Sequence, residues 1–356
     1  MQSCLALALA LFELAFLARA HASSDGLTFK LKKHEINAST LHPAMAFKSS
    51  IFGAHKAHLG VLPAWSTEID VGFPPRKVEV LIDTGSWDLI VDHDWYNPSK
   101  SLTSKNLHKD WNTFGDGRAY TDEVRLGDVK IKDVVVGHVR KGGDFPFRDG
   151  FQGLMGVSLP PNSFDTDKPT LTKAAVDQHA FKRNVWQLTL RHEGDSSLNI
   201  GKIDESEYEG ELGWVDLDEG QDEWRLEIDI NGYKAFGVVD SGGIGRMGAG
   251  VDRVKALFDR LPIRLTEVGP NDSSIEGWFD CDTLPDITFT AGGRELKYPK
   301  WLMKTDTTDN GTKCKFQVWG ADDMTDWNFG DTIFLMASIV FDIDNRRVGF
   351  APQRQK

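Results

Sequence analysis

The sequence predicts a large all-β protein made of two similar halves, and three observations lead to this prediction. From about Leu59 onward, short runs of β-type residues are bounded by Gly, Pro, Asn and Asp at close spacing. Convincing helical patterns occupy only Thr170–His179 and Val251–Leu261. An apolar run that ends in Asp-(Thr/Ser)-Gly occurs once in each half of the chain. Many short strands with few helices are typical of the all-β class.

The expected strands are runs in which a period of two dominates. This period is clear in Trp65–Val71, Lys77–Ile82 and Arg225–Ile230, where apolar side chains alternate with polar ones. Such alternation places one face of a strand on a core and the other face toward water. The remaining expected strands are Val129–Val136, Val185–Leu190, Phe236–Val239, Ile287–Thr290 and Ser338–Ile343.

Length and charge limit the kinds of partner. The chain has 356 residues, of which 40% are hydrophobic and 26% charged, so it can form two globular domains with buried cores. Its formal net charge is -12. Nucleic acids and anionic membranes attract a basic face, which this composition does not favour. We therefore expect peptides or small molecules as partners.

The N-terminus has the pattern of a secretory signal. An apolar run from Leu5 to Leu17 is followed by two small-x-small patterns, which end at Ala20 and Ala22. We expect residues 1–22 to be a signal peptide and the mature protein to be secreted into the extracellular space. No later stretch reaches the roughly 18 apolar residues that a membrane span needs.

Residues 23–56 are polar, lack a periodic pattern and promise no stable element. They include a basic cluster formed by Lys30, Lys32, Lys33 and His34. Because this segment places positive charge between a signal and an acidic body, it is interpreted as a pro-segment that detaches when carboxylates become protonated. A disordered N-terminal arm is the alternative interpretation.

The cysteines agree with export. After removal of the signal, the chain keeps only Cys281 and Cys314, and two cysteines in an oxidising compartment are most simply a disulfide. Closing a loop of about 33 residues would stabilise the fold by roughly 3–4 kcal/mol. Two buried free thiols are the less favoured alternative. Candidate N-glycosylation sites are Asn37, Asn271 and Asn310.

The two Asp-containing segments occupy equivalent places. The run Val78–Ile82 leads directly into Asp83–Ser86, and Ala235–Val239 leads into Asp240–Gly243. Each is followed further along by two residues and a glycine. These triplets are Leu154-Met155-Gly156 and Asn328-Phe329-Gly330. The same order of signals indicates a diverged duplication, with a first half at residues 57–208 and a second at residues 209–356.

Two carboxyl groups at equivalent strand ends are a candidate catalytic pair. A pseudo-twofold axis would bring Asp83 and Asp240 to one central place. Like charges that close cannot both ionise, so one proton is shared. One carboxylate can then take a proton from water while the other carboxyl donates a proton to a peptide carbonyl. This chemistry requires no metal, no cofactor and no covalent intermediate.

The flanking residues suit that chemistry. Thr84 and Ser241 offer hydroxyls that can lock the two loops together, and Ser86 can tune the first carboxyl. Gly85 and Gly242 allow backbone amides to approach the carboxylates and donate to them.

In these motifs the sequence resembles the pepsin-like aspartic peptidases, especially the secreted fungal ones, from about Leu59 to Pro352. The resemblance implies an all-β, bilobal fold with pseudo-twofold symmetry and a central cleft for an extended peptide. It implies a secreted, monomeric aspartic endopeptidase that acts on peptide or protein substrates through Asp83 and Asp240. It also implies a flap that closes over the substrate, with its tip at Phe114, Gly115, Asp116 and Gly117.

Further segments match the family in order. Phe151–Gly156 resembles the segment beside the first catalytic Asp, and the pair Cys281 and Cys314 stands where the family keeps a disulfide. The C-terminal matches are Phe329-Gly330-Asp331, Val340-Phe341-Asp342 and Val348–Ala351.

Four positions bear on activity. Gly243 replaces a Ser or Thr whose hydroxyl usually bonds the outer oxygen of the second carboxylate, so we expect weakened activity and a less acidic pH optimum. In the flap, Phe114 replaces a Tyr, and Ile90 replaces the Trp that bonds this Tyr. Asp116 resembles a fungal Asp that favours a basic substrate residue; a turn-forming role is the alternative.

Other classes are weakly supported. Gly243–Gly248 matches the dinucleotide pattern G-x-G-x-x-G, but the alternating strands and helices that this site needs do not surround it. Neither a serine hydrolase motif nor a zinc-binding H-E-x-x-H occurs. The main alternative is a non-catalytic or weakly active pepsin-like peptide-binding protein, which Gly243 and Phe114 motivate.

Overall fold

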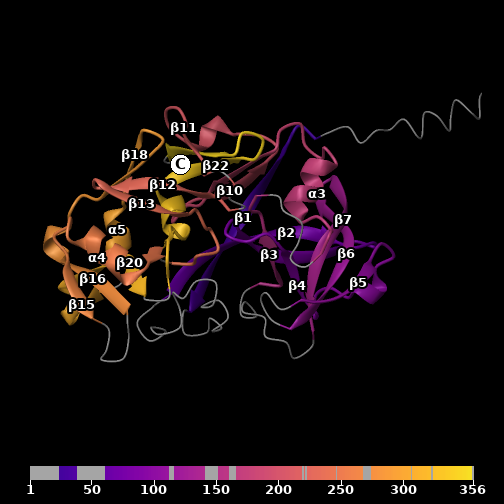
Figure 1. Ribbon diagram of the computed structural model, residues 1–356, viewed down its shortest axis with the longest axis horizontal. Coiled ribbons are helices and arrows are strands. Elements are labelled where there is room, and N and C mark those ends of the chain that lie inside the picture. Colours follow the sequence, from indigo (N-terminus) through magenta and orange to yellow (C-terminus); the bar gives the residue numbers. More distant parts are fainter. Residues whose placement is uncertain are drawn as a thin grey trace, which may run out of the picture.

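A computed structural model shows two lobes in which strands are the main regular element (Figure 1). It describes residues 24–37, 61–111, 116–140, 151–159, 166–218, 220, 223–245, 247–267, 274–305, 307–321 and 324–354. The α-helices among them are short: α3 (Leu171–Asp177), α4 (Val251–Phe258) and α5 (Lys300–Met303). The all-β, bilobal prediction is therefore confirmed. None of these helices has the length and apolarity to cross a membrane.

The larger sheet has thirteen strands among the described residues, in the order β11-β23-β22-β9-β10-β1-β2-β3-β8-β4-β7-β6-β5. Its strands are β1 (Leu27–Asn37), β2 (Val61–Val71), β3 (Arg76–Asp83), β4 (Leu89–Asp92), β5 (Lys105–Trp111), β6 (Gly117–Leu126), β7 (Val129–Val139), β8 (Gly153–Gly156), β9 (Val185–Thr189), β10 (Ser196–Ile200), β11 (Gly213–Asp216), β22 (Ala337–Asp342) and β23 (Arg347–Pro352). Both halves contribute, since β9 of the first half pairs with β22 of the second.

The second sheet lies within the C-terminal half and follows the order β15-β16-β20-β14-β21-β13-β12-β17-β18, with β19 paired to β20. Its strands are β12 (Arg225–Ile230), β13 (Tyr233–Val238), β14 (Met247–Ala249), β15 (Arg264–Glu267), β16 (Ser274–Asp280), β17 (Thr288–Ala291), β18 (Arg294–Lys297), β19 (Thr307–Thr308), β20 (Lys313–Ala321) and β21 (Trp327–Asn328). All eight runs that the sequence singles out as strands fall on strands of the two sheets.

The strand β1 corrects the prediction that residues 23–56 hold no stable element. Its first part pairs antiparallel with β10 and its second part with β2. The side chains of Leu31 and Ile36 are buried, and Leu27 and Phe29 pack partly against the core. The alternation of Leu27, Phe29 and Leu31 with polar residues is a strand pattern, which the basic cluster obscures in the sequence. The rest of the segment, residues 38–56, lies outside the described residues.

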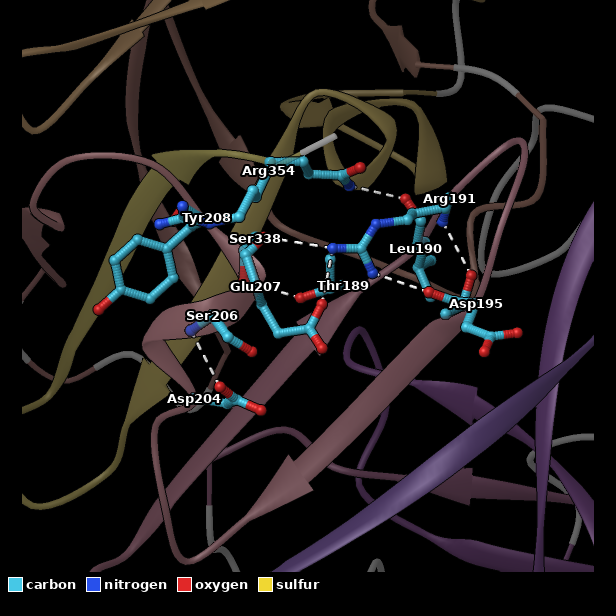
Figure 2. A network of polar contacts seen from close by, with 12 residues as sticks. Thr189, Leu190, Arg191, Asp195, Asp204, Ser206, Glu207, Tyr208, Ser338 and Arg354 are labelled. Carbon is cyan, nitrogen blue, oxygen red and sulfur yellow. Dashed lines mark hydrogen bonds and ion pairs between the residues drawn. The ribbon is translucent and has the colours of Figure 1, made fainter. Parts of the chain in front are cut away.

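A buried ion pair lies where the two halves join. Arg191, which follows β9, contacts Glu207 with 2.6 Å between Nη2 and Oε2, and both side chains are less than a tenth exposed. The guanidinium also donates to the backbone carbonyl oxygens of Asp195 and Glu207, as Figure 2 shows. Arg354 donates to the Tyr208 carbonyl, which fastens the C-terminal segment to the same region. These contacts hold the segment around Glu207 in place.

The disulfide between Cys281 and Cys314 is present, as the cysteine count predicts. It joins the end of β16 to β20 within the second sheet. Of the glycosylation candidates, Asn310 is exposed in a turn with a positive φ of 57°. Asn271 lies outside the described residues, and for Asn37 only the backbone is described.

Candidate active site

Each candidate Asp stands at the end of a strand that lies beside the downstream triplet of its own half. Asp83 ends β3, which runs parallel to β8 with Asp83 opposite Gly156. Asp240 follows β13, which runs parallel to β21 with Val238 opposite Asn328. The two halves thus build the same local arrangement from the same order of signals, as expected for a duplicated chain.

The hydroxyls of Thr84 and Ser241 lock the two Asp loops to each other. The backbone N–H of Thr84 donates to Ser241 Oγ at 3.1 Å, and the N–H of Ser241 donates to Thr84 Oγ1 at 2.9 Å. Each hydroxyl in turn donates at 2.8 Å to a carbonyl of the opposite half, that of Val239 or that of Ile82. All four bonds are buried, so the relative position of the loops is tightly fixed.

Gly85 and Gly242 bring the two carboxyl groups together. The N–H of Gly85 donates to Asp83 Oδ1 at 2.9 Å, and that of Gly242 donates to Asp240 Oδ1 at 2.8 Å. A Cβ atom on Gly85 would lie 2.3 Å from the Asp240 Cγ atom, and one on Gly242 would lie 2.4 Å from Asp83 Oδ1. Each glycine therefore faces the carboxyl group of the opposite half, and no larger residue fits there.

We expect Gly242→Ala to lower the rate of peptide cleavage by at least about 10²-fold, because the new methyl group must displace the Asp83 carboxyl. The measurement is the initial rate on a peptide substrate, with circular dichroism as the check on folding. Gly248→Ala is the matched control, since its Cβ would lie 3.2 Å from both the Met324 sulfur and the Trp319 carbonyl oxygen and so needs a much smaller adjustment. Equal rates for Gly242→Ala and wild type would contradict the assignment of this glycine to the site.

Burial and the neighbouring charge favour the protonated form of the Asp83 carboxyl. Burial and then the negative charge of Asp240 raise the pKa of Asp83 well above its usual range. The Ser86 hydroxyl, which donates to Asp83 Oδ2 at 2.5 Å, acts in the opposite direction without cancelling these effects. The pair is therefore suited to hold a single proton at acidic pH.

The outer oxygen of Asp240 has a donor that the sequence analysis did not assign. Asn328 Nδ2 donates to Asp240 Oδ2 at 2.6 Å. The expectation that Gly243 leaves this oxygen without a hydrogen bond is therefore wrong. The less acidic pH optimum was expected because of that missing bond, so it no longer has a structural reason. The sequence contains one signal for this donor. The triplet of the second half begins with the polar Asn328, whereas that of the first half begins with the apolar Leu154.

Another buried carboxyl, that of Asp331, lies near the pair. Burial, with a contribution from the charge of Asp240, raises the pKa of Asp331 well above its usual range, and its Oδ1 accepts from the Gly245 N–H at 2.9 Å. In the sequence, Asp331 is distinguished only as part of the C-terminal match Phe329-Gly330-Asp331. Its neutral form adds no charge to the surroundings of Asp240.

The flap is described only at its base. Phe114 and Gly115 lie outside the described residues, whereas Gly117 begins β6 opposite Val139. The Asp116 carboxylate forms an ion pair with Arg140 at 3.2 Å, and its carbonyl accepts from the Arg140 N–H at 2.9 Å. Asp116 thus joins the base of the flap to the end of β7, and its charge is already balanced by a cation of the chain itself.

One group among the described residues could hold a metal ion. Asp92, His93 and Asp94 place their ligand atoms within 4.8 Å of one another at the end of β4. The ring nitrogens of His93 lie 3.1 and 3.2 Å from oxygens of the two neighbouring carboxyl groups. Neither candidate catalytic Asp belongs to this group.

A bilobal β fold whose two Asp loops meet in reciprocal hydrogen bonds is that of an aspartic peptidase. The chain belongs to the eukaryotic aspartyl protease family, whose family model matches residues 64–353. It is accordingly a hydrolase of the aspartic endopeptidase class, and peptides are its substrates.

Named relatives cover most of the chain. Secreted aspartyl protease 1 of Malassezia globosa is 31% identical over 295 residues, which are 80% of this chain and 72% of that protein. Pepsin F of Oryctolagus cuniculus is 29% identical over 315 residues, 80% of each chain. A protein of Malassezia globosa named a probable inactive secreted aspartyl protease is 26% identical over 311 residues, 82% of this chain and 78% of that protein.

Proposed function

We propose that the protein cleaves peptide bonds by activating a water between Asp83 and Asp240. The observation that carries this proposal is the approach of the two loops, in which each glycine faces the opposite carboxyl. In the first step, Asp240 takes a proton from the water, the resulting hydroxide attacks the peptide carbonyl carbon, and Asp83 gives its proton to the carbonyl oxygen. In the second, Asp240 returns a proton to the leaving nitrogen while Asp83 takes one back, which breaks the C–N bond.

The test is cleavage of a mixed peptide library from pH 2.5 to 7, with and without a statine-type inhibitor. We expect cleavage on the acid side that the inhibitor blocks. The alternative, a pepsin-like peptide-binding protein without activity, predicts tight inhibitor binding and no cleavage at any pH. One relative is named a probable inactive secreted aspartyl protease. The presence of both carboxyls, both loop hydroxyls and the Asn328 donor favours the active enzyme.

We also propose that the protein is secreted as a monomer and that residues 23–56 are a pro-segment. Two relatives from Malassezia globosa carry the word secreted in their names. The expected signal peptide, residues 1–22, lies outside the described residues. The part of the proposed pro-segment that the structure describes is chiefly β1, so any detachment has to break the ladders with β10 and β2.

A polar cluster on β1 makes its attachment sensitive to pH. His34 Nε2 lies 2.7 Å from Glu79 Oε1 on β3, and the same carboxylate accepts from Ser66 on β2 and from Lys32. Burial lowers the pKa of His34. Burial alone raises the pKa of Glu79, but the hydrogen bonds from Ser66 and Lys32 and the charge of His34 hold it below its ordinary value.

Both shifts favour release of β1 in acid. A group whose pKa is depressed in the folded state contributes stability above its ordinary pKa and loses it as the pH falls. We therefore expect hydrogen-exchange protection of residues 27–37 to decrease from about pH 6.5, the ordinary value for His, to below about 4.5, that for Glu. Glu79→Gln should weaken this protection already at pH 7 and flatten its pH dependence. Glu68→Gln, which removes only an exposed partner of Lys77, is the control. Protection that is constant across this range would contradict the expectation.

A further inference from the structure

We propose that Asn328 is a positioning residue for catalysis, which holds the outer oxygen of Asp240 as Ser86 holds that of Asp83. This inference rests on the proposed role of the two carboxyls. In the first half a hydroxyl three residues after the Asp makes the contact, with 2.5 Å between Ser86 Oγ and Asp83 Oδ2. In the second half the residue that corresponds to Ser86 is Gly243, and the amide of Asn328, 88 residues after Asp240, makes the contact at 2.6 Å.

The orientation of the Asn328 amide is fixed by a second hydrogen bond. Its Oδ1 accepts from the backbone N–H of Gly330 at 2.8 Å. Because a backbone N–H can only donate, the oxygen of the amide has to face Gly330, and the NH₂ group has to face Asp240. The donor is therefore aimed at the carboxylate by the backbone of its own loop.

Asn328 and Gly243 depend on each other. A Cβ atom on Gly243 would lie 2.8 Å from Asn328 Oδ1 and 2.9 Å from the Gly330 Cα atom. The amide therefore occupies space that a Ser or Thr side chain would need. In the first half the polar and the apolar residue are exchanged. Ser86 stands at the position equivalent to Gly243, and the buried, apolar Leu154 stands at the position equivalent to Asn328.

The exchange of a hydroxyl for an amide has a chemical consequence. A hydroxyl can donate to a carboxylate or accept from a protonated carboxyl, whereas an amide NH₂ can only donate. Asn328 therefore stabilises the ionised form of Asp240 more strongly than the protonated form. This bias keeps the shared proton on Asp83, the carboxyl whose burial already favours the protonated form.

The test compares Asn328→Leu, Gly243→Ser and the double variant Gly243→Ser/Asn328→Leu, which copies the arrangement of the first half. Loss of a hydrogen bond to a charged group should lower kcat of Asn328→Leu by about 10- to 10²-fold, with a smaller effect on KM. The acid limb of its pH profile should move to higher pH, because the carboxylate has lost a donor. Gly243→Ser alone should be impaired by its clash with Asn328. The double variant should stay impaired, because its serine Cβ atom would still lie 2.9 Å from the Gly330 Cα atom and the leucine fills the space of the amide.

Asn345→Leu is the matched control. It removes the same kind of bond, 2.8 Å from Asn345 Nδ2 to Asp342 Oδ2, at a place that has no contact with the two Asp loops. Its kcat and pH profile should equal those of wild type. An Asn328→Leu enzyme with the rate and the acid limb of wild type would overturn the inference and leave the proposed function intact.

Thermal unfolding tests the inference without relying on activity. A bond that is stronger with the ionised carboxylate stabilises the fold most at pH 6 and contributes less as the pH falls. The difference in Tm between wild type and Asn328→Leu should therefore be present at pH 6 and shrink toward pH 2.5. A difference that is constant with pH would reduce Asn328 to a packing role and overturn the inference. If wild type cleaves nothing at any pH, the proposed function fails while this measurement still decides the role of Asn328.

Discussion

Asparagine in place of Asp83 or of Asp240 is expected to lower kcat for peptide cleavage by about 10²–10⁴-fold, because each variant removes one partner of a general acid/base pair. Both variants keep the shape of the side chain, so the packing of the two loops should persist. The measurement is single-turnover cleavage at the optimal pH, together with the affinity for a statine-type inhibitor.

The two variants should differ in stability. In Asp83→Asn the Ser86 hydroxyl can turn from donating to accepting, so the local hydrogen bond survives. In Asp240→Asn an NH₂ group at the Oδ2 position would face the NH₂ group of Asn328, and two donors cannot bond each other. We therefore expect a lower Tm for Asp240→Asn than for Asp83→Asn.

The control for these variants is Asp133→Asn, whose exposed side chain pairs with Lys105 in a surface contact. It should cleave at the wild-type rate. Wild-type rates in either Asp83→Asn or Asp240→Asn would show that the carboxyl pair is not the catalytic group.

Methionine in place of Arg191 is expected to lower the free energy of unfolding by about 3–5 kcal/mol, because the substitution removes the cation that the buried Glu207 carboxylate contacts. Arg191 also donates to the Asp195 and Glu207 carbonyls, so the hairpin between β9 and β10 loses contacts as well. The effect should appear as a lower midpoint in urea unfolding with little change in its slope.

The double variant Arg191→Met/Glu207→Leu should recover most of this loss, since a buried ion pair that is replaced by apolar residues of similar volume is often neutral in stability. Lys173→Met is the control. It breaks a partly exposed pair with Asp177 on α3, and such pairs contribute about 0–1 kcal/mol. An Arg191→Met protein within 1 kcal/mol of wild type would contradict the role given to this pair.

The internal repeat explains why the sequence predicts so much of the site. Asp83 and Asp240 each follow an apolar run, and a duplicated chain brings equivalent strand ends together. The strands were predictable for a similar reason, because a period of two is local. What could not be predicted depends on contacts between distant residues: the bond from Asn328 to Asp240 spans 88 positions, and the bond from Arg191 to the Glu207 carbonyl spans 16.

The strand β1 shows a different limit. Its alternating Leu27, Phe29 and Leu31 are as regular as those of other strands. The basic cluster that begins at Lys30 nevertheless favours a solvated arm when the segment is considered alone. Only the ladders that β10 and β2 supply on either side make the extended form stable. Propensity is a weak guide wherever neighbouring strands decide the outcome.

The place of β1 between β10 and β2 has a consequence for any processing of the N-terminus. An interior strand that leaves opens two edges at once, here the backbones of Ser196–Ile200 and Val61–Ser66. Open edges pair readily with other extended chains, so a molecule in this state would assemble with its neighbours. Because β1 is held by its ladders with β10 and β2, proteolytic cleavage after residue 37 need not release it. Departure of the strand and entry of a substitute segment have to be coupled if the protein is to remain soluble.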